Sequence, residues 1–146
     1  MEMNKYVSIL LSLLLLCSCS PDSKNREMIE FVRSQEHDSR LVGWWESVHV
    51  PEEFFYYDGN TFELLSLIRE TDGSYSEFGH GTYWYTKDGE LYFMKKASVF
   101  TGIMSANVGY RISDDLEYLL MKEPDGTFDP SCRRIAEAPE GYNPRK

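Results

Sequence analysis

The chain has 146 residues, 42% of them hydrophobic, and its 24 acidic and 15 basic residues give a formal net charge of -9. This length is typical of a single domain. The negative charge argues against a nucleic-acid-binding protein, because such proteins present a basic surface to the phosphates. Aromatic residues are abundant, with 10 Tyr, 8 Phe and 3 Trp, and most of them lie beyond the N-terminal segment.

The first 18 residues have the features of a secretory signal peptide. Residues 6–17 are apolar apart from Ser8 and Ser12, and Lys5 precedes them. The run is shorter than the roughly 20 residues that are needed to span the hydrocarbon core of a bilayer. It is typical of the core of a signal peptide, and we therefore expect residues 1–18 to be removed.

The end of this segment, Leu16-Cys17-Ser18-Cys19, resembles the lipobox of bacterial lipoproteins. In that motif a branched apolar residue and two small residues precede the cysteine that is acylated and becomes the N-terminus. The resemblance implies that Cys19 carries fatty acyl chains such as palmitate, and two or more chains hold a protein stably at a membrane. Ser20 in place of Asp is compatible with transfer to the outer membrane, so we expect an outer-membrane lipoprotein of the cell envelope. An ordinary signal peptide with incidental cysteines is the alternative, and the side of the membrane that the protein faces stays open.

The mature chain is expected to begin with a polar tether, residues 19–27, followed by one domain, residues 28–146. Between residues 27 and 36, Met28, Phe31 and Val32 recur at helical spacing. This pattern predicts a short amphipathic helix that packs on a sheet.

From residue 41 onward, turn signals recur at regular intervals. Four Asp-Gly pairs are strong hairpin signals because both residues tolerate positive φ; they lie at residues 58–59, 72–73, 88–89 and 125–126. Gly102 and Asp114-Asp115 fall in the remaining gap. We expect eight strands at about 42–50, 53–57, 61–69, 75–86, 90–96, 98–103, 106–112 and 116–122. The predicted fold is all-β, an antiparallel up-and-down meander of about eight strands closed into a small barrel, with a short N-terminal helix.

The hairpin at Asp88-Gly89 allows two registers. A three-residue loop pairs Tyr83 with Phe93 and gathers a coherent apolar set on one face, so we favour it. A two-residue turn shifts the pairing by one and sets Tyr83 opposite Met94.

Two segments resemble the lipocalin-like domains of small bacterial envelope lipoproteins over about residues 40–135. Leu41-Val42-Gly43-Trp44-Trp45 opens the first strand, where lipocalins carry Gly-x-Trp, here Gly43 and Trp45. Residues 81–83, followed by the Asp88-Gly89 hairpin, look like the family's middle hairpin. The resemblance implies an eight-stranded barrel that holds one small apolar ligand. It also implies an arginine packed across the Trp ring, for which the choices are Arg111, Arg133 and Arg134. It does not imply an enzyme.

The candidate ligand-binding residues are large aromatic residues expected inside the barrel: Trp45, Phe62, Tyr83, Tyr85 and Phe93. The interior of an eight-stranded barrel is just wide enough either to be filled by side chains or to hold one small ligand. Two functions therefore stay open. The protein either binds a small hydrophobic or amphipathic molecule in the barrel, or it is a non-catalytic protein-interaction module, such as an inhibitor, an immunity-type protein or an accessory subunit, with a filled aromatic core.

Sequence motifs of catalysis and metal binding are absent. His37, His49 and His80 are not spaced as metal ligands, and no nucleophile or phosphate-loop motif occurs. We expect no catalytic residue, metal or cofactor. Cys132 is left without a cysteine partner, so stability must come from the core, and Gly79-His80-Gly81 predicts a bent strand.

Two further surface features follow from residue patterns. Acidic residues gather late in the chain and predict a negatively charged rim at one end of the barrel; they are Asp114, Asp115, Glu117, Glu123, Asp125 and Asp129. Residues 97–104 are apolar after Lys95-Lys96. They form either a buried strand pair or an exposed loop tip, and exposed apolar tips mark ligand entrances or protein contacts.

Overall fold

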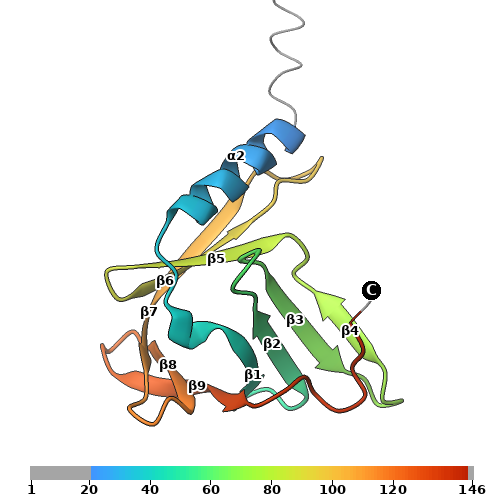
Figure 1. The fold of residues 1–146 in the computed structure, drawn as a ribbon, viewed down its shortest axis with the longest axis vertical. Coiled ribbons are helices and arrows are strands. Elements are labelled where there is room, and N and C mark those ends of the chain that lie inside the picture. Colours follow the sequence, from blue (N-terminus) through green and yellow to red (C-terminus); the bar gives the residue numbers. More distant parts are fainter. Residues whose placement is uncertain (1–20, 145–146) are drawn as a thin grey trace, which may run out of the picture.

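The computed structural model describes residues 21–144 and shows one helix packed on a curled sheet of nine strands (Figure 1). The helix is α2 (Pro21–Ser34), and a short 3-10 turn, η1 (Ser39–Leu41), follows it. The strands are β1 (Gly43–Ser47), β2 (Glu53–Tyr57), β3 (Leu64–Arg69), β4 (Tyr75–Phe78), β5 (Thr82–Lys87), β6 (Glu90–Lys95), β7 (Met104–Ile112), β8 (Tyr118–Lys122) and β9 (Phe128–Ile135). None of the described residues belongs to a helix long and apolar enough to cross a membrane. The predicted signal peptide and Cys19 lie outside the described residues.

The strands form one antiparallel sheet in the order β4-β3-β2-β1-β9-β8-β7-β6-β5. Strands that are consecutive in the sequence pair with each other in the sheet, except β4 and β5, which form its two edges. The first strand, β1, pairs with the last strand, β9. The all-β antiparallel meander and the N-terminal helix are therefore confirmed. The described residues contain no ladder between β4 and β5, so the observed shape is a curled half-barrel of nine strands.

The curl brings β5 against the residues that precede β3. The amide of Trp84 donates to the carbonyl of Phe62 at 3.0 Å, and Glu63 forms an isolated bridge with Tyr83. Phe62 has φ of 61°, a conformation that is strained for a bulky side chain. Its ring packs against both hydrophobic clusters of the molecule, which stabilises this conformation.

Two expected strands differ from the observed ones, and one observed strand was not expected. The strand expected at 75–86 is two strands, because Gly79 and Gly81 adopt φ of 69° and 75° and turn the chain between β4 and β5. The strand expected at 98–103 is a loop in which Phe100 is exposed, as in the exposed-tip alternative. Ile103 instead packs against residues beneath α2, and Met104 begins β7. Strand β9 has no counterpart in the prediction, and it lies at the centre of the sheet between β1 and β8.

The favoured register of the β5–β6 hairpin is wrong. Asp88 and Gly89 adopt φ of 52° and 77° and form a two-residue turn, so Tyr83 pairs with Met94 and Tyr85 with Tyr92. The favoured register assumed that one face of β5 is buried. In the structure both faces of β5 are buried, so the grouping of apolar residues on one face does not determine the register.

Two hydrophobic clusters lie on opposite sides of the sheet. The inner cluster is enclosed by the curl; its buried members are Leu41, Trp45, Tyr57, Trp84, Leu91, Ile112, Leu119 and Cys132. The outer cluster lies between α2 and the outer face of β5 and β6, and its buried members are Met28, Val32, Tyr83 and Tyr85. Burying a side chain such as Val32 contributes about 1.5–3 kcal/mol, so α2 is an integral part of the domain.

Helix α2 begins at Pro21, six residues before the predicted start, and includes most of the segment expected to be a polar tether. Proline is favoured in the first turn because its φ is already helical and it has no amide hydrogen to leave unpaired. Asp22 in the first turn and Arg33 in the last both interact favourably with the helix dipole.

The last described residues, 136–144, which we call the C-terminal segment, run back along the β1–β4 side of the molecule toward β4 (Figure 1). The hydroxyl of Tyr75 donates to the carbonyl of Glu140 at 2.6 Å, and the hydroxyl of Tyr142 donates to Glu77 at 3.0 Å. The ring of Tyr142 also contacts Trp44, with centroids 5.7 Å apart. The C-terminal segment is therefore a second layer on the outer face of the sheet.

The expectation of a single acidic rim is wrong. Asp114, Asp115 and Glu117 lie in the turn between β7 and β8, whereas Glu123 and Asp125 lie in the turn between β8 and β9. Successive turns of an antiparallel meander alternate between the two ends of the strands. The acidic residues are therefore divided between opposite ends of β8.

Candidate functional site

The five aromatic residues expected to bind a ligand do not form one site. Trp45 is fully buried in the inner cluster, and Phe93 packs against the same cluster. Tyr83 and Tyr85 face the other side of the sheet, beneath α2. Phe62 contacts both clusters, at the place where β5 meets the residues that precede β3. The corrected hairpin register separates Tyr83 from Phe93.

Arg134 is the arginine that packs across the Trp45 ring, with its guanidinium carbon 4.2 Å from the ring centroid. Its guanidinium donates hydrogen bonds to the carbonyls of Arg40, Val42 and Leu116. Gly43 has φ of 122°, and a Cβ there would lie 3.2 Å from a guanidinium nitrogen of Arg134. The absence of a side chain at Gly43 therefore leaves room for the Arg134 guanidinium, which covers Trp45 at one end of the inner cluster.

His37 lies where the inner and outer clusters meet, beside Phe62 and Trp84. Its ring stacks on Phe62 with centroids 3.5 Å apart and lies edge-on to Trp84 at 5.1 Å. The Nε2 atom is buried and has no hydrogen-bond partner among the described residues. Burial lowers the pKa of His37, so the neutral ring that suits this aromatic packing is favoured.

Cys132 is a buried free thiol in the inner cluster. Burial raises its pKa to about 11, so the reactive thiolate is scarce near neutral pH. Within residues 21–144, no three side chains of His, Cys, Asp and Glu are grouped so that they could hold a metal ion.

The surface hollows of the described part of the chain include four that are lined by none of the five predicted aromatic residues. One of about 600 Å³, between β4 and the C-terminal segment, is lined largely by turn residues and small polar side chains. Another, of about 550 Å³, lies on the outer face of β1–β3; we call it the aromatic pocket. Its lining consists of Trp44, Tyr56, Asp58, Glu63, Leu65, Ala138, Tyr142 and Pro144.

The strand register explains how the aromatic pocket arises. Trp44 pairs with Tyr56, and Tyr56 pairs with Leu65 on the next strand, so these three side chains share the outer face. The rings of Trp44 and Tyr56 are 4.8 Å apart and tilted by 34°. Tyr142 comes from the C-terminal segment, far away in the sequence. The pocket thus combines Trp44, which faces outward from β1, with Tyr142, which no local sequence pattern places there.

Two carboxylates stand at one side of the aromatic pocket. Asp58 accepts hydrogen bonds from the amides of Asn60 and Thr61, and Glu63 accepts one from the hydroxyl of Tyr83 at 3.0 Å. Burial and this carboxylate raise the pKa of Tyr83 to about 12, so its hydroxyl stays protonated and donating. Neither carboxylate belongs to an ion pair among the residues that the structure describes.

The pocket therefore presents aromatic faces next to two carboxylates that have no ion-pair partner among the described residues. This combination attracts organic cations, because the ring quadrupole and the carboxylates both favour positive charge. Its volume falls within the range of small-molecule sites. Comparisons of the chain with models of known families, with curated proteins and with solved structures return no match.

Proposed function

We propose that this chain is a lipid-anchored, lipocalin-like lipoprotein of the outer membrane, acylated at Cys19, that is non-catalytic and binds a small amphipathic cation in the aromatic pocket. The anchor rests on the lipobox-like residues 16–19. The lipocalin resemblance is supported by the contact between Arg134 and Trp45, which is the packing that the family implies.

Replacing Cys19 with alanine is expected to abolish incorporation of a palmitate analogue, because the thiol that receives the lipid is lost. Metabolic labelling followed by gel electrophoresis measures this. The control is Cys132→Ser, which must leave labelling intact because Cys132 is buried in the inner cluster. Undiminished labelling of Cys19→Ala would refute the anchor.

The ligand is placed in the aromatic pocket because the inner face is occupied by the protein's own side chains. Trp45 and Trp84 are both 0% exposed and fill the space that the curl encloses. The aromatic pocket is the observation that carries the proposal, since it offers about 550 Å³ with three aromatic rings and two carboxylates. A ligand with an apolar body and a cationic head matches both kinds of lining.

The purified protein is expected to bind benzyltrimethylammonium more tightly than neopentylbenzene, its neutral isostere, because only the cation gains from the carboxylates and the ring faces. Trp44→Ala is expected to weaken binding of the cation about tenfold, in line with a desolvated cation–π contact of more than 1 kcal/mol. Isothermal titration calorimetry measures both affinities.

Matched variants separate the two contributions. Trp44→Phe keeps a ring and must retain most of the affinity. Glu63→Gln keeps an acceptor for Tyr83 while removing the charge, so it must reduce the preference for the cation over the isostere. Equal affinity for the two compounds, or no effect of Trp44→Ala, contradicts the proposed site.

The filled inner cluster also favours the protein-interaction module as a second candidate function. Native mass spectrometry of the purified protein distinguishes the two. A bound small molecule that disappears in Trp44→Ala favours the pocket, whereas a ligand-free chain that also fails to bind the cation favours the interaction module.

A further inference from the structure

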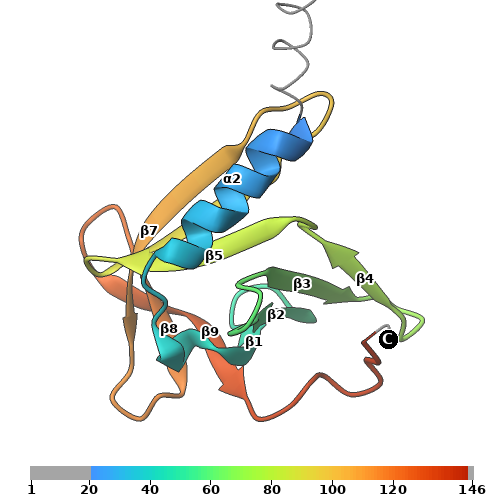
Figure 2. The same ribbon diagram turned by 45° about the horizontal axis from the view of Figure 1, so that its top comes forward.

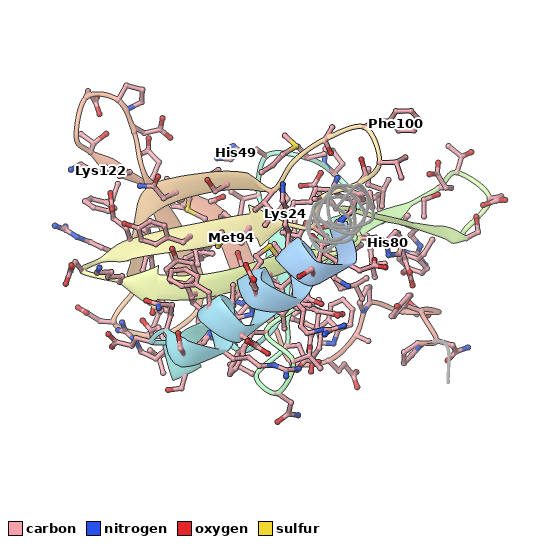
Figure 3. The ribbon with its side chains drawn as sticks, turned by 90° about the horizontal axis from the view of Figure 1, so that it is seen from above. Lys24, His49, His80, Met94, Phe100 and Lys122 are labelled. Carbon is pink, nitrogen blue, oxygen red and sulfur yellow. The ribbon has the colours of Figure 1, made fainter. Side chains whose placement is uncertain are left out.

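Two highly exposed apolar side chains, Val99 and Phe100, lie at the tip of the loop between β6 and β7. Val99 is 83% exposed and Phe100 is 93% exposed, and no other large hydrophobic side chain among the described residues is as exposed. Figure 3 shows Phe100 at the end of the loop, pointing away from the body of the molecule. Neighbouring exposed apolar residues of this kind mark a contact surface.

The loop presents these side chains in a pre-formed turn. The amide of Ser98 donates to the carbonyl of Thr101 at 2.9 Å. The hydroxyl oxygen of Ser98 accepts from the amides of Phe100 and Thr101, each at 3.1 Å. Because the turn is already closed, little ordering of the backbone is needed when Val99 and Phe100 meet a partner. We call residues 98–101 the apolar tip.

The loop is also tied to the start of α2. The side-chain amide of Asn25 donates to the carbonyl of Ala97 at 3.0 Å, and the amide of Ala97 donates to the side-chain oxygen of Asn25 at 2.7 Å. Figures 1 and 2 both show the loop beside the first turn of the helix. Cys19 precedes Pro21 by two residues, which span at most about 7 Å. The apolar tip and the proposed lipid attachment site are thus at the same end of the domain.

The charges near this end suit an anionic surface. Lys24 lies on the first turns of α2, and Lys95 and Lys96 lead from β6 into the loop, with Asp22 as the acid of the first helical turn. The chain as a whole carries a charge of -9. A negatively charged bilayer therefore repels most of the protein and attracts this end of it.

We propose that the apolar tip inserts Val99 and Phe100 into the interface of the bilayer that holds the lipid anchor, and that this second contact fixes the orientation of the domain on the membrane. The inference rests on the proposed acylation of Cys19. With one point of attachment the domain rotates freely, whereas two points hold α2 at a fixed angle to the surface. The aromatic pocket then has a constant direction relative to the bilayer.

The test uses the full acylated protein reconstituted into vesicles of phosphatidylethanolamine and phosphatidylglycerol. An environment-sensitive fluorophore is attached at Gly102→Cys, where a side chain meets no atom within 4 Å. Asp114→Cys carries the same label as the matched control, because it lies in an exposed turn beyond the far end of β7. That nine-residue strand spans about 27 Å, so the control position is well away from the tip. Cys132 is buried and does not compete for the label.

We expect the label at residue 102 to shift its emission to the blue and to be several-fold less accessible to iodide than the label at residue 114. Adding Val99→Ser and Phe100→Ser to the Gly102→Cys protein is expected to restore iodide access while the protein still floats with the vesicles. If the two labels are equally accessible in protein that floats with the vesicles, the membrane contact is refuted and the anchor stands. If the protein does not float with the vesicles at all, the proposed anchor itself fails.

Discussion

Replacing Trp45 with alanine is expected to lower the free energy of unfolding by about 3–5 kcal/mol, the range for truncating a large buried aromatic side chain. Trp45 is fully buried, and its indole nitrogen donates to the carbonyl of Leu41 at 2.8 Å. The substitution opens a cavity in the inner cluster and leaves the Arg134 guanidinium without its ring. Urea denaturation followed by far-UV circular dichroism measures the loss.

The adjacent tryptophan provides the control. Trp44 lies on the outer face and lines the aromatic pocket, so Trp44→Ala must destabilise the protein clearly less than Trp45→Ala. If Trp45→Ala prevents folding, Trp45→Phe gives an intermediate loss that can still be measured. Equal losses at positions 44 and 45 would contradict the assignment of inner and outer faces to β1.

Arg134→Ala is expected to reduce the free energy of unfolding by about 2–4 kcal/mol, since hydrogen bonds from charged groups contribute about 1.5–3 kcal/mol and a cation–π contact about 0.5–2 kcal/mol. The side chain donates to three backbone carbonyls and covers Trp45. Alanine leaves those carbonyls without this donor and exposes the indole. Thermal and urea denaturation of the variant both measure the effect.

Arg133 is the matched control for this experiment. Its guanidinium pairs with Glu46 on the sheet surface, and its side chain is 53% exposed. Exposed ion pairs contribute little to stability, so Arg133→Ala must change the denaturation midpoint much less than Arg134→Ala. A larger effect at Arg133 would mean that the Arg134 contacts do not stabilise the end of the inner cluster.

Most turns of this fold could be predicted from sequence because they depend on local chemistry, although the turn at Gly79 and Gly81 was expected to be a bent strand. The four Asp-Gly pairs all lie between consecutive strands, and three of their glycines, Gly73, Gly89 and Gly126, adopt positive φ. Strand β9 could not be predicted in the same way, since Pro130 and neighbouring charged residues argue against a central strand. In the structure Pro130 pairs with Leu120 next to a register shift, where the missing amide hydrogen is tolerated.

The candidate site was less predictable than the fold. Among Arg111, Arg133 and Arg134, only three-dimensional packing identifies Arg134 as the residue that covers Trp45. The predicted aromatic set assumed one buried face, and α2 buries the second face of β5 as well. The aromatic pocket depends on Tyr142, which reaches Trp44 through the return of the C-terminal segment rather than through any local pattern.

The pairing of β1 with β9 also bears on how the chain acquires its structure. This ladder joins residues roughly 90 positions apart, such as Trp44 and Ile135, and it is the one ladder among the described strands that links β1–β4 with β5–β9. Contacts of such long sequence separation form slowly, because a large loop must close before they contribute. Each half can form its hairpins as it emerges, but the centre of the sheet stays open until β9 is available. The domain therefore completes its folding only after nearly the whole chain is available, and until then both unpaired edges remain open to other chains.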